Sequence, residues 1–184
     1  MKKVFIIHGF EGSPNGGWRP WLMSELEKQD IYACALSMPS PEKPDCHEWV
    51  GEISRHVDKR DEVYLVGHSL GVPAILHFLE SIKFSIAGAV LVSGPSEKNE
   101  NKKLDSFLKN GFDYKTIKLR SKNFVIIHGD NDPLVPLSSA RIFAKQLNGK
   151  LIVIKNGGHL NGRSGWCSLP QCLEALLEMM KTNL

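Results

Sequence analysis

The amino-acid sequence predicts an α/β fold in three layers, with a parallel sheet covered by helices on both faces. Short apolar stretches rich in β-branched residues recur along the chain, and amphipathic stretches lie between them. The apolar stretches are continuous rather than alternating, which is typical of strands whose two faces are both buried. Strand, helix and strand repeated in this order predicts parallel pairing through helical crossovers.

Six apolar stretches are expected to form the strands of this sheet. In chain order they are residues 3–9, 31–36, 62–67, 86–93, 123–129 and 150–156. Short runs of β-branched and other apolar residues favour strands that are buried on both faces. Cys34 lies inside the second stretch, so we expect it to be a small core residue.

Five stretches have apolar residues at helical spacing. Trp21, Leu22 and Leu26 show this spacing in the first stretch, and Trp49 and Ile53 show it in the second. The expected helices are residues 18–28, 46–58, 70–82, 137–147 and 169–181. Trp21 and Trp49 are therefore expected to face the core.

The least regular part of the chain is the polar segment 94–122, in which a short helix is expected from about Leu104 to Lys109. Two roles are open for this segment: a mobile flap over a site, or a crossover between two strands. Its short length favours the crossover. Since the rest of the chain is used for strands and helices, we expect little or no cap over the sheet.

Length and charge narrow the class of protein. A chain of 184 residues suits one compact core, so a single domain over residues 1–184 is expected. The net charge of +3 is mildly basic and the lysines are scattered, which argues against a nucleic-acid interface. No apolar run approaches the 18 residues of a membrane helix. The N-terminal apolar run is too short for a secretion signal, so a cytoplasmic location is expected.

The cysteines predict neither a metal site nor a disulfide framework. None of Cys34, Cys46, Cys167 and Cys172 forms a CxxC pair, and their spacing does not match a zinc site. Free thiols fit a reducing compartment. No metal and no cofactor are therefore expected.

The most informative motif is "LVGHSLG", Leu65 to Gly71, in which a predicted strand ends in G-x-S-x-G and a predicted helix follows. This is the pattern of a nucleophile elbow, a sharp turn that lifts the serine hydroxyl clear of the sheet. Glycine fits at positions 67 and 71 because the residues two before and two after the serine crowd each other. By itself the motif is also compatible with a tight turn that contains an incidental serine.

A base and a carboxylate follow in the order that this chemistry requires. A serine nucleophile needs a histidine to accept its proton and an acid to orient that histidine, in the chain order Ser, Asp or Glu, His. Asp130 and Asp132 follow the fifth predicted strand, and His159 follows the sixth on a glycine-rich loop. Residues after strand carboxyl ends meet at one edge of the sheet. We therefore expect Ser69, one of the two aspartates and His159 to form a triad.

Other histidines compete poorly as the base. His68 is next to Ser69 in sequence, so its side chain should point elsewhere. His8 and His128 each precede a glycine at a strand end, where hydrogen-bonded structural roles are expected.

Acyl transfer also needs donors for the oxyanion of the transition state. The N–H of Leu70, directly after the nucleophile, and the N–H of Phe10, on the loop after the first strand, are the expected pair. Phosphate binding is the rival explanation for this glycine-rich loop, but it lacks both G-x-x-x-x-G-K-[ST] and G-x-G-x-x-G.

With these residues the sequence resembles the α/β-hydrolase superfamily, and within it the compact YdeN-like serine hydrolases, a family that also includes a retinoblastoma-binding protein. The resemblance spans nearly the whole chain, through "HGFEGSPNGGWRPWL", "MPSPEKPDCHEWV", "LVGHSLGVPAILHFLE", "GDNDPLVP" and "GGHLNGRSGW". It implies Ser69, Asp132 and His159 as the triad, with Asp130 supporting its loop. It also implies a sheet order of 2-1-3-4-5-6 and a small domain with little cap.

Binding to the retinoblastoma protein is not expected for this chain. The retinoblastoma-type motif L-x-C-x-E is absent, because "LPQCLE" has Pro170 two residues before the cysteine. A protein partner thus stays unknown.

The remaining tryptophans follow the two site loops. Trp18 comes after the loop that carries Phe10, the oxyanion loop, and Trp166 comes after the loop that carries His159, the histidine loop. Both are therefore candidates for the walls of a substrate site. For Trp18, core packing is the favoured alternative.

The expected function is a metal-independent serine hydrolase, most simply a carboxylesterase that acts on small esters with short acyl groups. A thioesterase, amidase or peptidase would use the same residues. The alternative from another class is a non-catalytic protein-binding module that keeps the fold.

Overall fold

The computed structural model describes residues 1–98 and 100–182, and its centre is a six-stranded parallel sheet. The strands are β1 (Lys2–Ile7), β2 (Tyr32–Leu36), β3 (Glu62–His68), β4 (Gly88–Val92), β5 (Phe124–Gly129) and β6 (Lys150–Ile154). Their order in the sheet is β2-β1-β3-β4-β5-β6. All six expected strands and their expected order are therefore confirmed.

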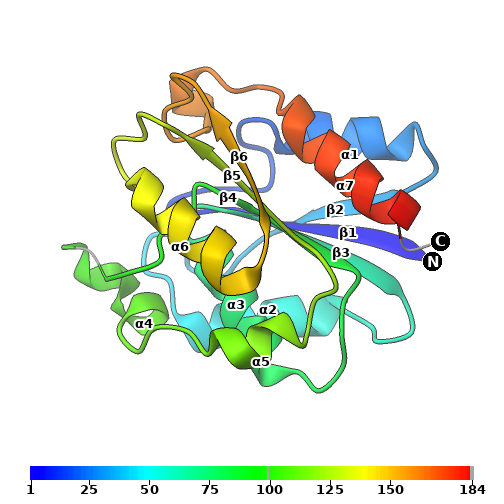
Figure 1. The fold of residues 1–184 in the computed structure, drawn as a ribbon, viewed down its shortest axis with the longest axis horizontal. Helices are drawn as coiled ribbons and strands as arrows, with labels where there is room; N and C mark the ends of the chain where they lie inside the picture. The colour runs from blue at the N-terminus through cyan, green and yellow to red at the C-terminus, as the bar shows by residue number, and fades with distance from the viewer. Residues whose placement is uncertain (99, 183–184) are drawn as a thin grey trace.

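Helices cover both faces of the sheet (Figure 1). They are α1 (Arg19–Glu27), α2 (Cys46–His56), α3 (Gly71–Ser81), α4 (Asp105–Leu108), α5 (Tyr114–Lys118), α6 (Leu137–Leu147) and α7 (Pro170–Thr182), with short 3-10 turns η1 (Lys102–Leu104) and η2 (Gly162–Ser164). In Figure 1, α1 and α7 lie on one face, and α2, α3, α5 and α6 lie on the other.

Each face has its own apolar core, which explains the continuous apolar strands. In the larger core, Trp49 and Ile53 of α2 pack with the apolar residues of α3 and of the strands. In the other core, Leu22 and Leu26 of α1 pack with α7. Every residue of β4 and β5 is buried, as expected for central strands covered on both sides.

The edge strand β2 departs from this pattern. Its residues are only partly buried except for Leu36, and Tyr32 is exposed. Cys34 packs against the larger core as expected but is only half-buried, because β2 is an edge strand that pairs with β1 on one side.

The irregular segment forms the crossover between β4 and β5, which pair in parallel. It contains α5 as well as the expected short helix, which the structure divides into η1 and α4. Phe107, Leu108 and Ile117 are buried in the larger core, so these short helices are anchored by packing. The α5 helix was missed because five residues are too few to show helical periodicity.

Strand register places the loops of the site side by side. Ile7 pairs with Gly67, so the loop after β1 lies next to the turn after β3. At the same carboxyl edge, but on the other side of the strand order, Gly129 pairs with Ile154, which brings the loops after β5 and β6 together.

Within residues 1–98 and 100–182, no helix is both long enough and apolar enough to cross a membrane.

Candidate active site

Loops at the carboxyl edge of the sheet border a cleft of about 590 Å³. The loops after β1, β3 and β6 contribute Phe10, Ser69 and His159, and the acid loop after β5 contributes Leu134 and Val135. Ligands of open α/β sheets bind outside the carboxyl ends of the strands, which is where this cleft lies.

Ser69 occupies a strained turn between β3 and α3. Its φ is +54°, in the left-handed region that residues other than glycine rarely adopt. The Ser69 N–H donates a 2.8 Å hydrogen bond to the carbonyl oxygen of Val92, which fastens the turn to the neighbouring strand. Such strain persists where the surrounding structure imposes it, and it is frequent at functional sites.

The two glycines of the motif are required by close packing. A Cβ at Gly67 would lie 2.9 Å from the carbonyl carbon and oxygen of Gly71, and a Cβ at Gly71 would collide with the carbonyl oxygen of Ile7. A Cβ at Gly9 would in turn lie 2.8 Å from the Cβ of Ser69. The expected crowding across the elbow is therefore present, and it extends to the loop after β1.

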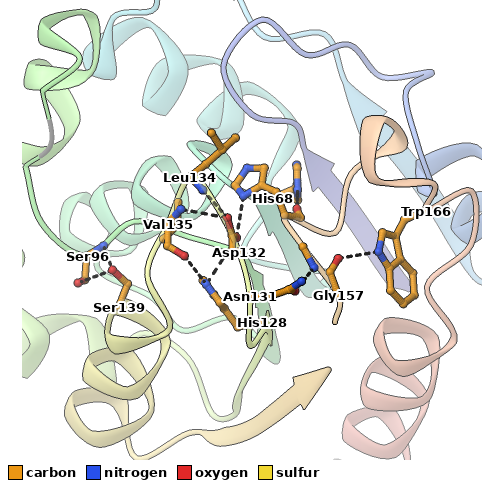
Figure 2. A network of polar contacts seen from close by, with 12 residues as sticks. His68, Ser96, His128, Asn131, Asp132, Leu134, Val135, Ser139, Gly157 and Trp166 are labelled. Atoms are coloured by element: carbon orange, nitrogen blue, oxygen red, sulfur yellow. Dashed lines mark hydrogen bonds and ion pairs between the residues drawn. The ribbon is translucent and has the colours of Figure 1, made fainter. Parts of the chain in front are cut away.

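Asp132 is a buried carboxylate with several donors around it (Figure 2). Its Oδ1 accepts hydrogen bonds from the N–H groups of Leu134 at 2.8 Å and Val135 at 3.0 Å. Its Oδ2 accepts from Nδ1 of His159 at 2.8 Å. Burial acts to raise the pKa of Asp132, but the bonds from His159, Val135 and Leu134 outweigh it, so the pKa lies below 3.8. The carboxylate is therefore ionised at neutral pH.

His159 connects this carboxylate to the cleft. Because Nδ1 donates to Asp132, the neutral imidazole keeps its lone pair on Nε2, as a base requires. Ser69 and His159 border the same cleft, although no hydrogen bond joins Ser69 Oγ to His159 among the residues described. Such contacts are often longer before substrate binds.

Asp130 has a different place. Its Oδ1 accepts the N–H of Asn156 at 2.7 Å, and its own N–H donates to the carbonyl of Ile154. Neighbouring Asn131 accepts the N–H of Gly158 at 2.7 Å through its side-chain oxygen. Asp130 and Asn131 therefore hold the loop that carries His159, whereas Asp132 contacts the imidazole itself.

The N–H groups of Phe10 and Leu70 are available at the cleft. Leu70 is the N-cap of α3, a position whose N–H has no acceptor within the helix. Within residues 1–98 and 100–182, neither of these two N–H groups donates a hydrogen bond. Both residues border the cleft beside Ser69, so the pair can serve as oxyanion donors.

The structure places the two tryptophans elsewhere than in the cleft wall. Trp18 is fully buried, and its Nε1–H donates to the carbonyl oxygen of Leu160 at 2.8 Å. Trp166 is half-buried, and its Nε1–H donates to the carbonyl of Gly157 at 2.7 Å (Figure 2). Trp18 therefore has the core position that was its favoured alternative, whereas Trp166 does not border the cleft as expected. The two indoles hold the histidine loop on either side of His159.

His8 and His128 have the structural roles expected of them. Nδ1 of His8 donates to the carbonyl oxygen of Gly9, and its Nε2 accepts the N–H of Met38. His128 donates through Nε2 to the carbonyl oxygen of Val135 at 2.9 Å, which steadies the acid loop (Figure 2).

As expected, His68 is not positioned as the base, but its actual role was not foreseen. Its side chain points toward the histidine loop, where Nε2–H donates to the carbonyl oxygen of His159 at 3.0 Å. The two imidazole rings lie 5.1 Å apart between centroids. Burial, and then the electrostatic interaction with the neighbouring His159, lower the pKa of His68 to about 3. His68 is therefore a neutral support behind His159.

The free energy of unfolding should fall as the pH is lowered, because of His68. Its pKa is about 3 in the folded protein and 6.5 in an unfolded chain, so its stabilising contribution is complete above pH 6.5 and is lost as the pH falls toward 3. Between pH 6.5 and pH 5 the loss should be about 2 kcal/mol. Urea unfolding at these two pH values should show a smaller decrease for His68→Gln than for the unaltered protein. An equal decrease in both proteins would contradict this role.

Among the cleft residues that were not foreseen are three polar side chains from the segments after β1 and β6. Arg19, Asn161 and Arg163 border the cleft, although they stand in stretches that we used only for the family resemblance. The arginines did not match any catalytic pattern, and their convergence depends on how the loops after β1 and β6 fold against each other.

The sheet order, the helical layers and the serine turn define the α/β-hydrolase fold. The model of the Serine hydrolase family matches residues 4–178, and the chain belongs to this family. The chain is 35% identical over 179 residues to YdeN of Bacillus subtilis (strain 168), covering 95% of this chain and 94% of that protein.

Two solved structures are similar to this chain. The crystal structure of the ydeN gene product from B. subtilis matches with a TM-score of 0.93 and 34% identity, over 98% of this chain and 100% of that one. Est1E from Butyrivibrio proteoclasticus matches with a TM-score of 0.76 and 18% identity, over 98% of this chain and 88% of that one. At this identity the second match concerns the fold alone.

Proposed function

We propose that this serine hydrolase is a carboxylesterase for small esters, with Ser69 as nucleophile, His159 as base and Asp132 as the acid that orients it. The observation that carries the proposal is the 2.8 Å hydrogen bond between Asp132 and His159 at a cleft that Ser69 also borders. The strained turn at Ser69 and its two tightly packed glycines support the same assignment.

From these positions, the reaction proceeds in two steps, formation of an acyl-enzyme and its hydrolysis. Nε2 of His159 takes the Ser69 proton while Oγ bonds to the ester carbonyl carbon, and the N–H groups of Phe10 and Leu70 stabilise the oxyanion. The bond from carbon to the leaving oxygen then breaks, and His159 gives its proton to that oxygen. Water attacks the acyl-enzyme with His159 again as base, which releases the acid and restores Ser69.

Asp132 acts through His159. An ionised carboxylate at Nδ1 fixes the tautomer in which Nε2 has the free lone pair, and it stabilises the imidazolium that forms. The N–H groups of Leu134 and Val135 hold the other carboxylate oxygen, so the acid has a fixed orientation. The indoles of Trp18 and Trp166 restrain the loop on either side of His159.

Thioesterase, amidase and peptidase activities would use the same groups. A panel of matched esters, thioesters and peptide amides, assayed with pure protein and with fluorophosphonate labelling, tests the proposal directly. Ester turnover that exceeds thioester and amide turnover is expected. Absence of both labelling and turnover would favour the protein-binding module.

Acyl chain length provides a second test. Segment 94–122 contributes Pro95, Asn101 and Leu104 to the border of the cleft. No residue of its helices α4 and α5 borders the cleft, because Phe107, Leu108 and Ile117 are buried in the larger core, so we expect no tunnel. Each additional buried CH₂ contributes about 0.8 kcal/mol only while apolar wall is available. We therefore expect kcat/KM on p-nitrophenyl esters to be greatest from acetate to butyrate and to fall by octanoate, measured below micellar concentrations. A steady rise through decanoate would reveal a deep acyl channel.

A further inference from the structure

The cleft contains a buried arginine that the proposed reaction does not use. Arg19 begins α1, and its side chain is only 6% exposed, yet it borders the cleft together with Ser69 and His159. Its Nε–H donates to the carbonyl oxygen of Ser13 at 2.9 Å. Its Cζ lies 5.9 Å from the centroid of the Trp18 ring.

This guanidinium has no acidic partner in the described part of the chain, residues 1–98 and 100–182. The ion pairs found there involve other cations, and the terminal nitrogens of Arg19 make no hydrogen bond to those residues. Burial lowers the pKa of Arg19 to about 10, so the group is still charged at neutral pH. The terminal nitrogens are not among the buried side-chain atoms that lack a partner, although the residue as a whole is buried, so they are open to the cleft that Arg19 borders. This arrangement presents unpaired donors of a positive charge to an anion brought by a ligand.

The local backbone leaves room for the guanidinium. Nη2 of Arg19 lies against Gly16, at the position that a Cβ of another residue would occupy. Gly16 and Gly17 border the cleft as well. The glycine-rich loop therefore brings Arg19 to the cleft, in addition to placing the N–H of Phe10.

The other charges near the cleft do not neutralise Arg19. Arg163 borders the cleft from η2 and is exposed, which adds a second cation at the rim. Glu11 also borders it but is exposed to solvent. The carboxylate of Asp132 is buried and already bonded to His159 and to two N–H groups.

We propose that the cleft selects ester substrates that carry a second, anionic group, either a carboxylate or a phosphate. Arg19 binds this substrate oxyanion, with Arg163 at the rim. Arginine suits the task, because its planar guanidinium can form two parallel hydrogen bonds to either group. This inference rests on the proposed esterase function and names the substrate class of the same site.

A purely structural role for Arg19 predicts a different result. If Arg19 served only to hold Ser13 and the oxyanion loop, its loss would lower the turnover of all esters by the same factor. If it binds an oxyanion, its loss lowers kcat/KM for an anionic ester far more than for its neutral partner. The ratio of the two kcat/KM values therefore separates the two roles.

The kinetic test uses two matched pairs. On the acyl side, mono-p-nitrophenyl glutarate is compared with methyl p-nitrophenyl glutarate, and on the leaving-group side, 3-acetoxybenzoate is compared with methyl 3-acetoxybenzoate. The unaltered enzyme should prefer the anionic member of at least one pair. Arg19→Gln should reduce that preference on the order of 10-fold to 100-fold, the range expected for a hydrogen bond to a charged group.

The controls identify the source of this change. Arg163→Gln should reduce the preference less, because an exposed charge is screened by solvent. Arg141→Gln, on the exposed surface of α6, should leave the ratio unchanged. No preference in either pair, or an unchanged ratio in Arg19→Gln, would overturn the inference while the esterase function stands.

A binding measurement separates this inference from the proposed reaction. Calorimetric titration of Ser69→Ala with monomethyl glutarate, dimethyl glutarate and methyl phosphate requires no turnover. Binding of either anion, weakened when Arg19→Gln is added, supports the oxyanion site even if ester hydrolysis is absent, and the tighter anion identifies the group. Failure of both anions to bind more tightly than dimethyl glutarate would overturn it.

Discussion

Replacing Ser69 with alanine is expected to abolish fluorophosphonate labelling and to lower ester turnover by at least about 10⁴-fold. The variant loses the oxygen that forms the acyl-enzyme, while His159 keeps its hydrogen bond to Asp132. The cleft and the N–H groups of Phe10 and Leu70 should be unaffected. Turnover is measured on p-nitrophenyl butyrate, and folding is checked by circular dichroism and thermal unfolding.

A matched control is available one strand away. Ser93 follows β4, has a φ of +49° and is fully buried, so Ser93→Ala makes the same chemical change at a similarly strained position. Ser93 is not among the residues that border the cleft, and its Oγ has no hydrogen-bond partner in the described part of the structure. Ser93→Ala should therefore keep labelling and turnover. Undiminished turnover in purified Ser69→Ala would exclude Ser69 as the nucleophile.

The second large effect is expected for Asp132→Asn, which should lower kcat by about 10⁴-fold because it favours the wrong tautomer of the base. The N–H groups of Leu134 and Val135 would bind the amide oxygen of asparagine. The amide nitrogen would then face Nδ1 of His159, where it donates instead of accepting. Nδ1 would keep its lone pair, and the proton would move to Nε2, which could no longer accept the proton of Ser69.

Asp130→Asn is the matched control for this substitution. It makes the same change two residues earlier, at a carboxylate that accepts the N–H of Asn156. An asparagine oxygen can accept that same bond, so activity should fall far less than in Asp132→Asn. Measuring kcat and thermal stability for both variants decides between the two acids. A larger loss of kcat in Asp130→Asn, with its stability unchanged, would assign the orienting role to Asp130.

The candidate triad was predictable because its evidence is local in sequence. The glycines around Ser69 are needed to avoid collisions within a few residues, and these requirements leave a recognisable motif. Asp132 and His159 each follow an apolar strand directly, and parallel strands bring their carboxyl ends to one edge of the sheet. The choice between Asp130 and Asp132 could not be made in this way, because it depended on resemblance to other hydrolases.

The errors and omissions concern side-chain contacts that tertiary packing decides. Trp166 was expected in the cleft wall, but it does not border the cleft and its indole donates to the carbonyl oxygen of Gly157. Trp18 is buried as favoured, but its acceptor at Leu160, 142 residues away, could not be foreseen. The expectation that His68 would not serve as the base agrees with the structure, but its bond to the carbonyl oxygen of His159, 91 residues away, was not foreseen. A side chain leaves a strand toward one of two faces, and the residue that it meets there depends on the packing of other elements.

By itself, the sequence determined the α/β fold, the strand order suggested by resemblance, and the positions of a candidate serine, acid and histidine. These features depend on apolar periodicity and on short-range steric requirements, both of which can be seen in consecutive residues. Only the tertiary structure decided that Asp132 contacts His159, that two tryptophans hold the histidine loop, and that Arg19 borders the cleft without an acidic partner among residues 1–98 and 100–182. Hydrogen bonds and charge pairing between loops act through space, so the order of residues along the chain does not record them.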